Sequence, residues 1–211
     1  WGHILKDAYS GKLAPLYNLL GEKPLLSGSP PPIMPMELIS RYVGKLTTID
    51  AGRGCPFECS FCTVINVQGR KSRGRTADEV EWAIRENFKH GIKRYFITDD
   101  NFSRHRDWEE ILDRIIHIRE MDKIKISFMI QVDTACHRIP RFIQKAASAG
   151  CTKVFIGLEN INPESLKGTG KKQNNIKEYK EMLMAWRRAR VITCAGYIIG
   201  FPDDTYESFM K

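Results

Sequence analysis

A repeating unit runs through this chain from Leu46 onward: a short apolar run rich in β-branched residues, a loop, and an amphipathic helical segment. Strands that alternate with helices are joined by right-handed crossovers and therefore pair in parallel. The chain is thus expected to form an α/β fold, either a barrel or a curved open sheet, with about five βα units. The predicted strands are Leu46–Ala51, Arg94–Thr98, Lys125–Val132, Thr152–Leu158 and Val191–Ile199.

The segments between these strands carry helix signals of their own. Thr76-Ala-Asp-Glu79 is a capping box, which places a helix start at Ala77. The other helices are predicted from apolar stripes, which we expect to pack in the core rather than to contact a cofactor. They lie at Trp108–Ile115, Pro140–Ala149 and Tyr179–Trp186.

The chain upstream of the repeat has a different character. Residues Trp1 to about Asn18 follow the pattern of an amphipathic helix, and Ser27–Pro35 is rich in proline. The run Pro30–Pro32 favours extended polyproline geometry. We expect this second stretch to be a linker that holds an upstream segment away from the strand-and-helix repeat.

A CxxxCxxC loop, formed by Cys55, Cys59 and Cys62, follows directly after the first predicted strand. Its short spacers let three thiolates face one metal centre. Iron-sulfur clusters are usually held by four Cys, and catalytic metal sites keep one position free of protein ligands. The loop therefore predicts a metal centre with an open position, at the carboxyl end of the strands where ligands bind in such folds.

Two other arrangements of the cysteines stay open. A structural zinc site would need a distant fourth ligand, and its usual signature is two separated Cys pairs. A disulfide framework is disfavoured because the sequence has no secretory signal pattern. The composition predicts a reducing, cytoplasmic location. We expect small buried residues at the remaining cysteines, Cys136, Cys151 and Cys194.

Positive charge gathers around the cysteine loop, in a chain whose net charge is +8. Such a cluster suits an anionic cofactor, an acidic substrate or a nucleic acid, and it also suits a solvated basic loop. Nucleic acid is not favoured, because no aromatic RNA-binding motif accompanies it. No apolar run approaches the roughly 18 residues that would span a bilayer, so no membrane span is predicted. The basic residues are Arg53, Arg70, Lys71, Arg73 and Arg75.

The cysteine loop, with Phe61 before its last Cys, resembles that of the radical S-adenosylmethionine (radical SAM) superfamily. Three strand-end landmarks of that family follow in order: Ile97-Thr-Asp-Asp-Asn101, Gly157-Leu-Glu-Asn160 and Gly196-Tyr-Ile-Ile-Gly200. The family barrel usually has about six βα units, of which this sequence has about five. The resemblance therefore implies a partial TIM-like (β/α) barrel.

The resemblance also implies roles for residues. Cys55, Cys59 and Cys62 would hold a [4Fe-4S] cluster whose fourth iron binds S-adenosylmethionine. Reductive cleavage of that cofactor would give a 5′-deoxyadenosyl radical, which takes hydrogen from the substrate. The other expected cofactor contacts are Asp99, Asp100 and Asn101 at the methionyl ammonium group, Glu159 at the ribose, Phe61 and the segment of Gly196, Ile198 and Gly200 near the adenine, and Gln131.

Structural roles compete with these assignments, although Asp100 is the first choice for the ammonium contact. The competing roles are a helix cap for Asn101 or Ser103, an ion pair with a Lys for Glu159, a satisfied core amide for Gln131, plain hydrophobic packing for Phe61 and a bend at Gly196 and Gly200.

The N-terminal pattern resembles radical SAM enzymes that carry a cobalamin-binding domain ahead of the barrel. We expect residues 1–40 to be the tail of such a domain plus the Pro-rich linker. Residues 41–211 would be the radical SAM core, incomplete at its C-terminal end. Any cobalamin would then be held by a domain absent from these residues.

The leading hypothesis is a radical SAM enzyme that acts on a small-molecule substrate by methyl transfer, cyclisation or a related carbon-centred modification. An electron donor such as flavodoxin or ferredoxin would reduce its cluster. One alternative is an RNA-modifying radical enzyme of the methylthiotransferase kind. The basic charge favours this alternative, but the sequence lacks the second cysteine cluster that it would need. The other is a non-catalytic iron-sulfur electron carrier, which would need no ribose contact.

Overall fold

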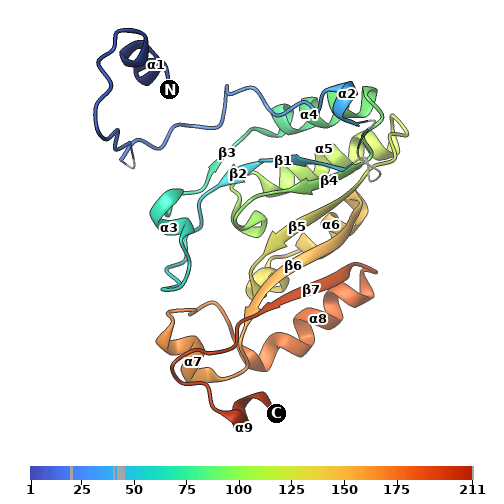
Figure 1. Cartoon of the computed structure of the whole chain (residues 1–211). Helices are drawn as coiled ribbons and strands as arrows, with labels where there is room; N and C mark the ends of the chain where they lie inside the picture. Colours follow the sequence, from blue (N-terminus) through green and yellow to red (C-terminus); the bar gives the residue numbers. More distant parts are fainter. Residues whose placement is uncertain (20, 40, 42–45, 211) are drawn as a thin grey trace.

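The computed structural model describes residues 1–19, 21–39, 41 and 46–210. Five strands form a parallel sheet in the order β1-β4-β5-β6-β7 (Figure 1). Each overlaps a predicted strand, so the α/β class and the parallel pairing are confirmed. Within the described residues β1 and β7 each pair with one neighbour, which makes the sheet an open, partial barrel. The strands are β1 (Leu46–Ile49), β4 (Arg94–Ile97), β5 (Ser127–Val132), β6 (Cys151–Glu159) and β7 (Ile192–Tyr197).

The connections between these strands carry the predicted helices, which lie along one face of the sheet (Figure 1). The capping box is confirmed: Thr76 Oγ1 accepts from the Glu79 N–H at 3.2 Å, and the Glu79 carboxylate accepts from the Thr76 N–H at 2.8 Å. The left-handed Gly150 (φ +99°) ends the third helix, as expected. The helices are α4 (Ala77–Lys89), α5 (Trp108–Glu120), α6 (Phe142–Ala149) and α8 (Tyr179–Arg188).

The hydrophobic core lies between the sheet and these helices. In β5 the buried Phe128, Ile130 and Val132 belong to the core, and they alternate with half-buried residues that face the other side. Trp186 of α8 is fully buried, and its ring meets that of Phe142 edge-on at 6.2 Å between centroids. The face of the sheet away from the helices is therefore the less buried one.

The first helix is shorter than predicted. α1 spans Gly2–Tyr9 rather than reaching Asn18. Gly11 adopts a left-handed conformation (φ +65°), and the ring of Pro15 would clash with a helical carbonyl four residues earlier. No residue of α1 is buried, so its apolar stripe does not pack on the barrel core.

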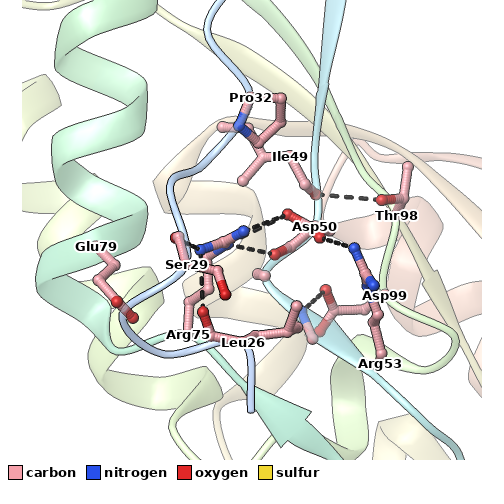
Figure 2. A network of polar contacts seen from close by, with 12 residues as sticks. Leu26, Ser29, Pro32, Ile49, Asp50, Arg53, Arg75, Glu79, Thr98 and Asp99 are labelled. Carbon is pink, nitrogen blue, oxygen red and sulfur yellow. Dashed lines mark hydrogen bonds and ion pairs between the residues drawn. The ribbon is translucent and has the colours of Figure 1, made fainter. Parts of the chain in front are cut away.

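The Pro-rich linker lies against the barrel core, and Arg75 anchors it (Figure 2). The Arg75 side chain is only 3 % exposed. Its Nη1 donates to the backbone oxygens of Ser29 at 2.5 Å and Leu26 at 3.3 Å, while Nε and Nη2 donate to Asp50 Oδ1 at 3.2 and 3.0 Å. Arg75 thus ties the linker to the loop after β1.

A second anchor, Asn87 of α4, binds the linker just before the short helix α2 (Met36–Ile39). Asn87 Nδ2 donates to the Pro32 carbonyl at 3.2 Å, and Asn87 Oδ1 accepts from the Met34 N–H at 3.1 Å. Near the first anchor, the Gly28 N–H donates to the Glu79 carboxylate at 2.6 Å. Side chains of the core therefore satisfy backbone groups along the linker.

We expect Arg75→Met to lower the free energy of unfolding by about 1.5–3 kcal/mol, because hydrogen bonds from a charged donor are lost. It should also speed proteolytic cleavage between residues 24 and 34. Chemical denaturation and limited proteolysis measure the two effects. Arg106→Met is the matched control, since the Arg106 side chain is 91 % exposed. Equal cleavage rates in Arg75→Met and the unmodified chain would contradict this role.

Candidate metal centre

The cysteine loop leaves the sheet after β1 through a short hairpin. β2 (Gly52–Arg53) pairs antiparallel with β3 (Arg73–Gly74), and α3 (Val64–Val67) lies between them. The buried His105 ring packs under the hairpin, with its Nε2 3.1 Å from the Ala51 carbonyl oxygen. A side chain at Gly52 or Gly74 would collide with this ring. The sequence did not predict these strands, because two residues show no periodicity.

The three cysteines lie together at this end of the sheet. Cys59 is buried, and Cys55 and Cys62 are half-buried. Burial raises the pKa of the Cys55 thiol and the nearby Cys59 and Cys62 raise it further, although hydrogen bonds from the Phe57 backbone and the Asn101 side chain lower it. The loop is compact, since the Cys62 N–H donates to the Cys59 carbonyl at 3.0 Å.

The residue types of this loop are those that hold iron-sulfur clusters. Within the part of the chain that the structure describes, no three His, Cys, Asp or Glu side chains converge as ligands of one metal ion. A [4Fe-4S] cluster takes each thiolate on a different iron, so its ligands do not need to meet at one point. Three thiolates on one loop therefore fit such a cluster.

Asp99 and Asp100, at the end of β4, hold the backbone that leads into the cysteine loop. The Gly52 N–H donates to Asp99 Oδ1 at 2.5 Å, and the Gly54 N–H donates to Asp100 Oδ2 at 2.6 Å. Gly54 has φ +98°, and a side chain there would collide with the carbonyl oxygen of Lys71. Both carboxylates predicted as cofactor contacts thus position the loop. Their contact with a cofactor stays a prediction.

Burial raises the pKa of Asp99 to about 7, the hydrogen bond from the Gly52 N–H lowers it, and the nearby charges of Asp100 and Asp50 raise it further. An acid whose pKa is raised by folding makes the folded state lose stability as pH rises from the unfolded pKa, about 4, to the folded one. We expect the free energy of unfolding to fall by roughly 1.4 kcal/mol per pH unit between about pH 4 and 7 because of this group. Asp99→Asn should remove this pH dependence, as measured by denaturation across that range. Parallel pH profiles of the two proteins would contradict the assignment.

Asn101 belongs to a buried network rather than to a helix cap. It makes no side-chain capping bond, and its Nδ2 donates to Asp133 Oδ2 at 3.0 Å. Asp133, just after β5, also accepts from Arg104 Nε at 2.7 Å and Nη2 at 2.9 Å, and from Ser103 Oγ at 3.1 Å. Arg104 in turn lies 5.5 Å over the ring of Phe57 in the cysteine loop. The network links two strand ends to that loop.

Glu159, at the end of β6, forms the predicted ion pair with a lysine. Its Oε1 lies 2.6 Å from Lys171 Nζ, and both side chains are largely buried. Glu159 also has φ +66°, a strained value for a residue other than glycine. Lys171 Nζ lies 5.6 Å from the ring centre of Phe61, which packs against Phe201. The ribose contact of Glu159 and the adenine contact of Phe61 stay predictions.

The remaining predicted contacts have structural partners. Gln131 Nε2 donates to the Asp99 carbonyl at 3.1 Å, and a side chain at Gly196 would come within 2.9 Å of Phe155. Ile198, beyond the end of β7, donates its N–H to the Glu159 carbonyl at 2.7 Å. Gly200 adopts φ +102°, which marks a bend. The contact of these residues with a cofactor likewise stays a prediction.

A cleft of about 650 Å³ borders the cysteine loop. Three cationic side chains contribute to its wall, and two of them pair with carboxylates: Arg104 with Asp133, and Arg138 with Glu178. The lining residues are Pro56, Phe57, Arg104, Ala135, Arg138, Lys172, Gln173, Asn174 and Asn175.

The other cysteines divide into two groups. Cys136 and Cys151 are buried as predicted, and burial raises the pKa of each thiol to about 12. The prediction for Cys194 is wrong: it is exposed, because it lies on the edge strand β7. Two inert buried thiols and an exposed one thus accompany the three-cysteine loop.

Comparison with known proteins decides the family. A family model of the Radical SAM superfamily matches residues 49–211, which is more than half of the chain. The chain belongs to the Radical SAM superfamily. This family uses a [4Fe-4S] cluster and S-adenosylmethionine, so the cofactors expected from the sequence are confirmed at the level of the family.

Several methyltransferases are similar to this radical SAM chain. Bacteriochlorophyllide d C-12(1)-methyltransferase of Chlorobaculum tepidum is 29 % identical over 99 % of the chain and 46 % of its own length. Hopanoid C-2 methylase of Rhodopseudomonas palustris is 27 % identical over 85 % of the chain and 34 % of its own length. The chain thus spans less than half the length of these relatives.

A solved structure supports the fold of the radical SAM chain. The radical S-adenosylmethionine methyltransferase TsrM from Kitasatospora setae, with tryptophan and a SAM analogue bound, superposes with a TM-score of 0.69 at 24 % identity. The match covers 86 % of this chain and 35 % of TsrM. The partial barrel predicted from the sequence is confirmed. No helix among the described residues is long and apolar enough to cross a membrane.

Proposed function

We propose that this chain is the radical SAM part of a methyltransferase that acts on a small molecule. Cys55, Cys59 and Cys62 would hold a [4Fe-4S] cluster, leaving one iron for S-adenosylmethionine. The observation that carries the proposal is the CxxxCxxC loop at the carboxyl end of an open parallel sheet, held there by the strand-end carboxylates Asp99 and Asp100. When bound, cluster and cofactor would supply the electron and the reactive carbon group.

The residues of the chain would orient these groups. Asp100 uses Oδ2 to hold the Gly54 N–H, and a carboxylate has about four lone-pair sites, so it can also accept from an ammonium group. Glu159 uses Oε1 to bind Lys171, which leaves Oε2 for a ribose hydroxyl. The strained backbone of Glu159 supports this assignment, because such strain concentrates at functional sites.

Methyl transfer is the favoured reaction because the similar proteins include methyltransferases of bacteriochlorophyllide and a hopanoid methylase. A similar TsrM structure with cobalamin bound supports a cobalamin-associated subgroup. Residues 1–40 would then be the tail of a cobalamin-binding domain plus the Pro-rich linker. We further propose a flavodoxin or ferredoxin as electron donor and a cytoplasmic location, in keeping with free rather than disulfide-bonded cysteines.

Anaerobic reconstitution with iron and sulfide, followed by dithionite reduction with S-adenosylmethionine, tests the proposal. We expect 5′-deoxyadenosine to form only when cluster and reductant are both present. A reconstituted cluster that yields no 5′-deoxyadenosine would instead favour the electron carrier. Stimulation of cofactor cleavage by added RNA would favour the RNA-modifying alternative.

A further inference from the structure

Gln173 follows α7 (Pro163–Gly168) in the chain, and its side chain reaches the cysteine loop. Its Nε2 donates to Cys59 Sγ at 3.5 Å, a suitable length because sulfur is larger than oxygen. The two residues are 114 positions apart in the sequence. Only the fold, which brings the segment between β6 and α8 onto the cysteine loop, creates this contact.

The orientation of this amide favours the sulfur. Gln173 Oε1 is buried and has no hydrogen-bond partner among the described residues. A thiolate has no proton to donate, so when Cys59 ligates a cluster only the N–H side of the amide can hydrogen-bond to its sulfur. A buried acceptor without a partner is uncommon and needs a reason. The contact of the same amide with Cys59 supplies that reason.

The backbone around Gln173 is fixed to its surroundings. Thr134 Oγ1 donates to the Gln173 carbonyl at 3.3 Å. The adjacent Asn174 donates through Nδ2 to the carbonyl oxygens of Gly157 at 3.2 Å and Leu158 at 2.7 Å. The backbone that carries the Gln173 side chain is therefore held by Thr134 and by the end of β6.

A second amide lies at another of the three cysteines. The Asn101 side chain lies near Cys55 and lowers the pKa of its thiol. Its orientation is set because Oδ1 accepts from Ser103 Oγ at 2.8 Å and Nδ2 donates to Asp133 at 3.0 Å. A side-chain amide thus lies at two of the three candidate cluster ligands, and the buried network fixes the one at Cys55.

We infer that Gln173 is a positioning residue that raises the reduction potential of the cluster by hydrogen bonding to Cys59 Sγ. The inference rests on the proposed function, which assigns the cluster to these cysteines. A donor at a ligating sulfur stabilises the added negative charge of the reduced cluster, and such hydrogen bonds are among the features that set cluster potentials. Removing the donor makes the cluster harder to reduce.

The test is an EPR-monitored redox titration of the reconstituted whole chain, with dithionite as reductant. In Gln173→Leu the ratio of reduced to oxidised cluster at a given potential should fall about tenfold, which equals a midpoint about 59 mV lower for a one-electron couple. Iron content should stay unchanged. The matched control is Gln144→Leu, the same substitution at an exposed position of α6, and it should keep the original midpoint.

Gln173→Glu gives a signature that a purely structural role would not produce. Its ionised carboxylate lacks a donor and adds negative charge beside Cys59, so the midpoint falls further. Protonation restores an O–H donor. The midpoint of this variant should therefore rise more steeply on acidification than that of the unmodified chain.

An unchanged midpoint in cluster-loaded Gln173→Leu would overturn the inference. Failure of both variants to hold a cluster would overturn it too, since Gln173 would then be a structural requirement. If the unmodified chain takes up no cluster, the proposed function fails instead, so the two failures are distinguishable.

Discussion

Replacing Cys55, Cys59 and Cys62 together by Ala is expected to abolish iron uptake and the brown chromophore. The unmodified chain should take up about four iron atoms after anaerobic reconstitution. These thiolates are the only protein ligands proposed for the cluster, and alanine offers none. Iron and sulfide analysis together with the visible spectrum measures the loss.

Two other cysteines serve as controls for this experiment. Cys194→Ser changes an exposed thiol on β7, and Cys136→Ala changes a buried one in the core. Both variants should keep the iron content of the unmodified chain. Full iron content in the triple variant, or loss of iron in Cys194→Ser alone, would require a different ligand set.

Asp133→Leu is expected to lower the free energy of unfolding by about 3–5 kcal/mol, the cost typical of breaking a buried ion pair. The Asp133 side chain is only 2 % exposed, and it accepts hydrogen bonds from Arg104, Asn101, Ser103 and the Ala135 N–H. Arg104, Asn101 Nδ2 and the Ala135 N–H would lose this acceptor, while Ser103 would keep its bond to Asn101 Oδ1. Chemical denaturation at neutral pH measures the effect.

The pH dependence gives this prediction a second signature. Burial alone would raise the pKa of Asp133, but the hydrogen bonds and charge of Arg104 hold it below its ordinary value. A depressed pKa stabilises the folded state above the unfolded pKa of about 4 and loses that effect as pH falls through the folded pKa. The difference in free energy of unfolding between the unmodified chain and Asp133→Leu should therefore become smaller at low pH.

A surface carboxylate provides the comparison. Asp113 pairs with Lys145 on α5 and α6, and its side chain is 53 % exposed. Asp113→Leu should change stability by no more than about 1 kcal/mol, because exposed pairs contribute little. Similar losses in Asp113→Leu and Asp133→Leu would contradict the role given to the buried network.

Local signals in the sequence predicted most of the fold. The capping box at Thr76 and the β-branched runs depend on neighbours within a few residues. The helix and strands that they mark could therefore be predicted without the tertiary structure. The first helix was predicted too long because its apolar pattern was followed past Gly11 and Pro15, two residues that end helices. The short β2 and β3 are fixed by packing over His105, which no local pattern announces.

The sequence predicted where the residues of the candidate site lie, at strand ends, but not which groups they hydrogen-bond to. Strand ends pointed to Asp99, Asp100 and Glu159, yet the bonds of the two aspartates to Gly52 and Gly54 span 47 and 46 residues. Asp133 also follows a strand directly, so the same rule could have found it. Gln173 carried no signal, because its contact with Cys59 depends entirely on the fold.

The EPR spectrum of the reduced cluster, recorded with and without S-adenosylmethionine, tests the central claim most directly. If three cysteines leave one iron open to the cofactor, adding S-adenosylmethionine should change the signal of the unmodified chain. Adding adenosine, which lacks the methionyl group, should not. Identical spectra with and without S-adenosylmethionine, at full iron content, would contradict an open iron at this site.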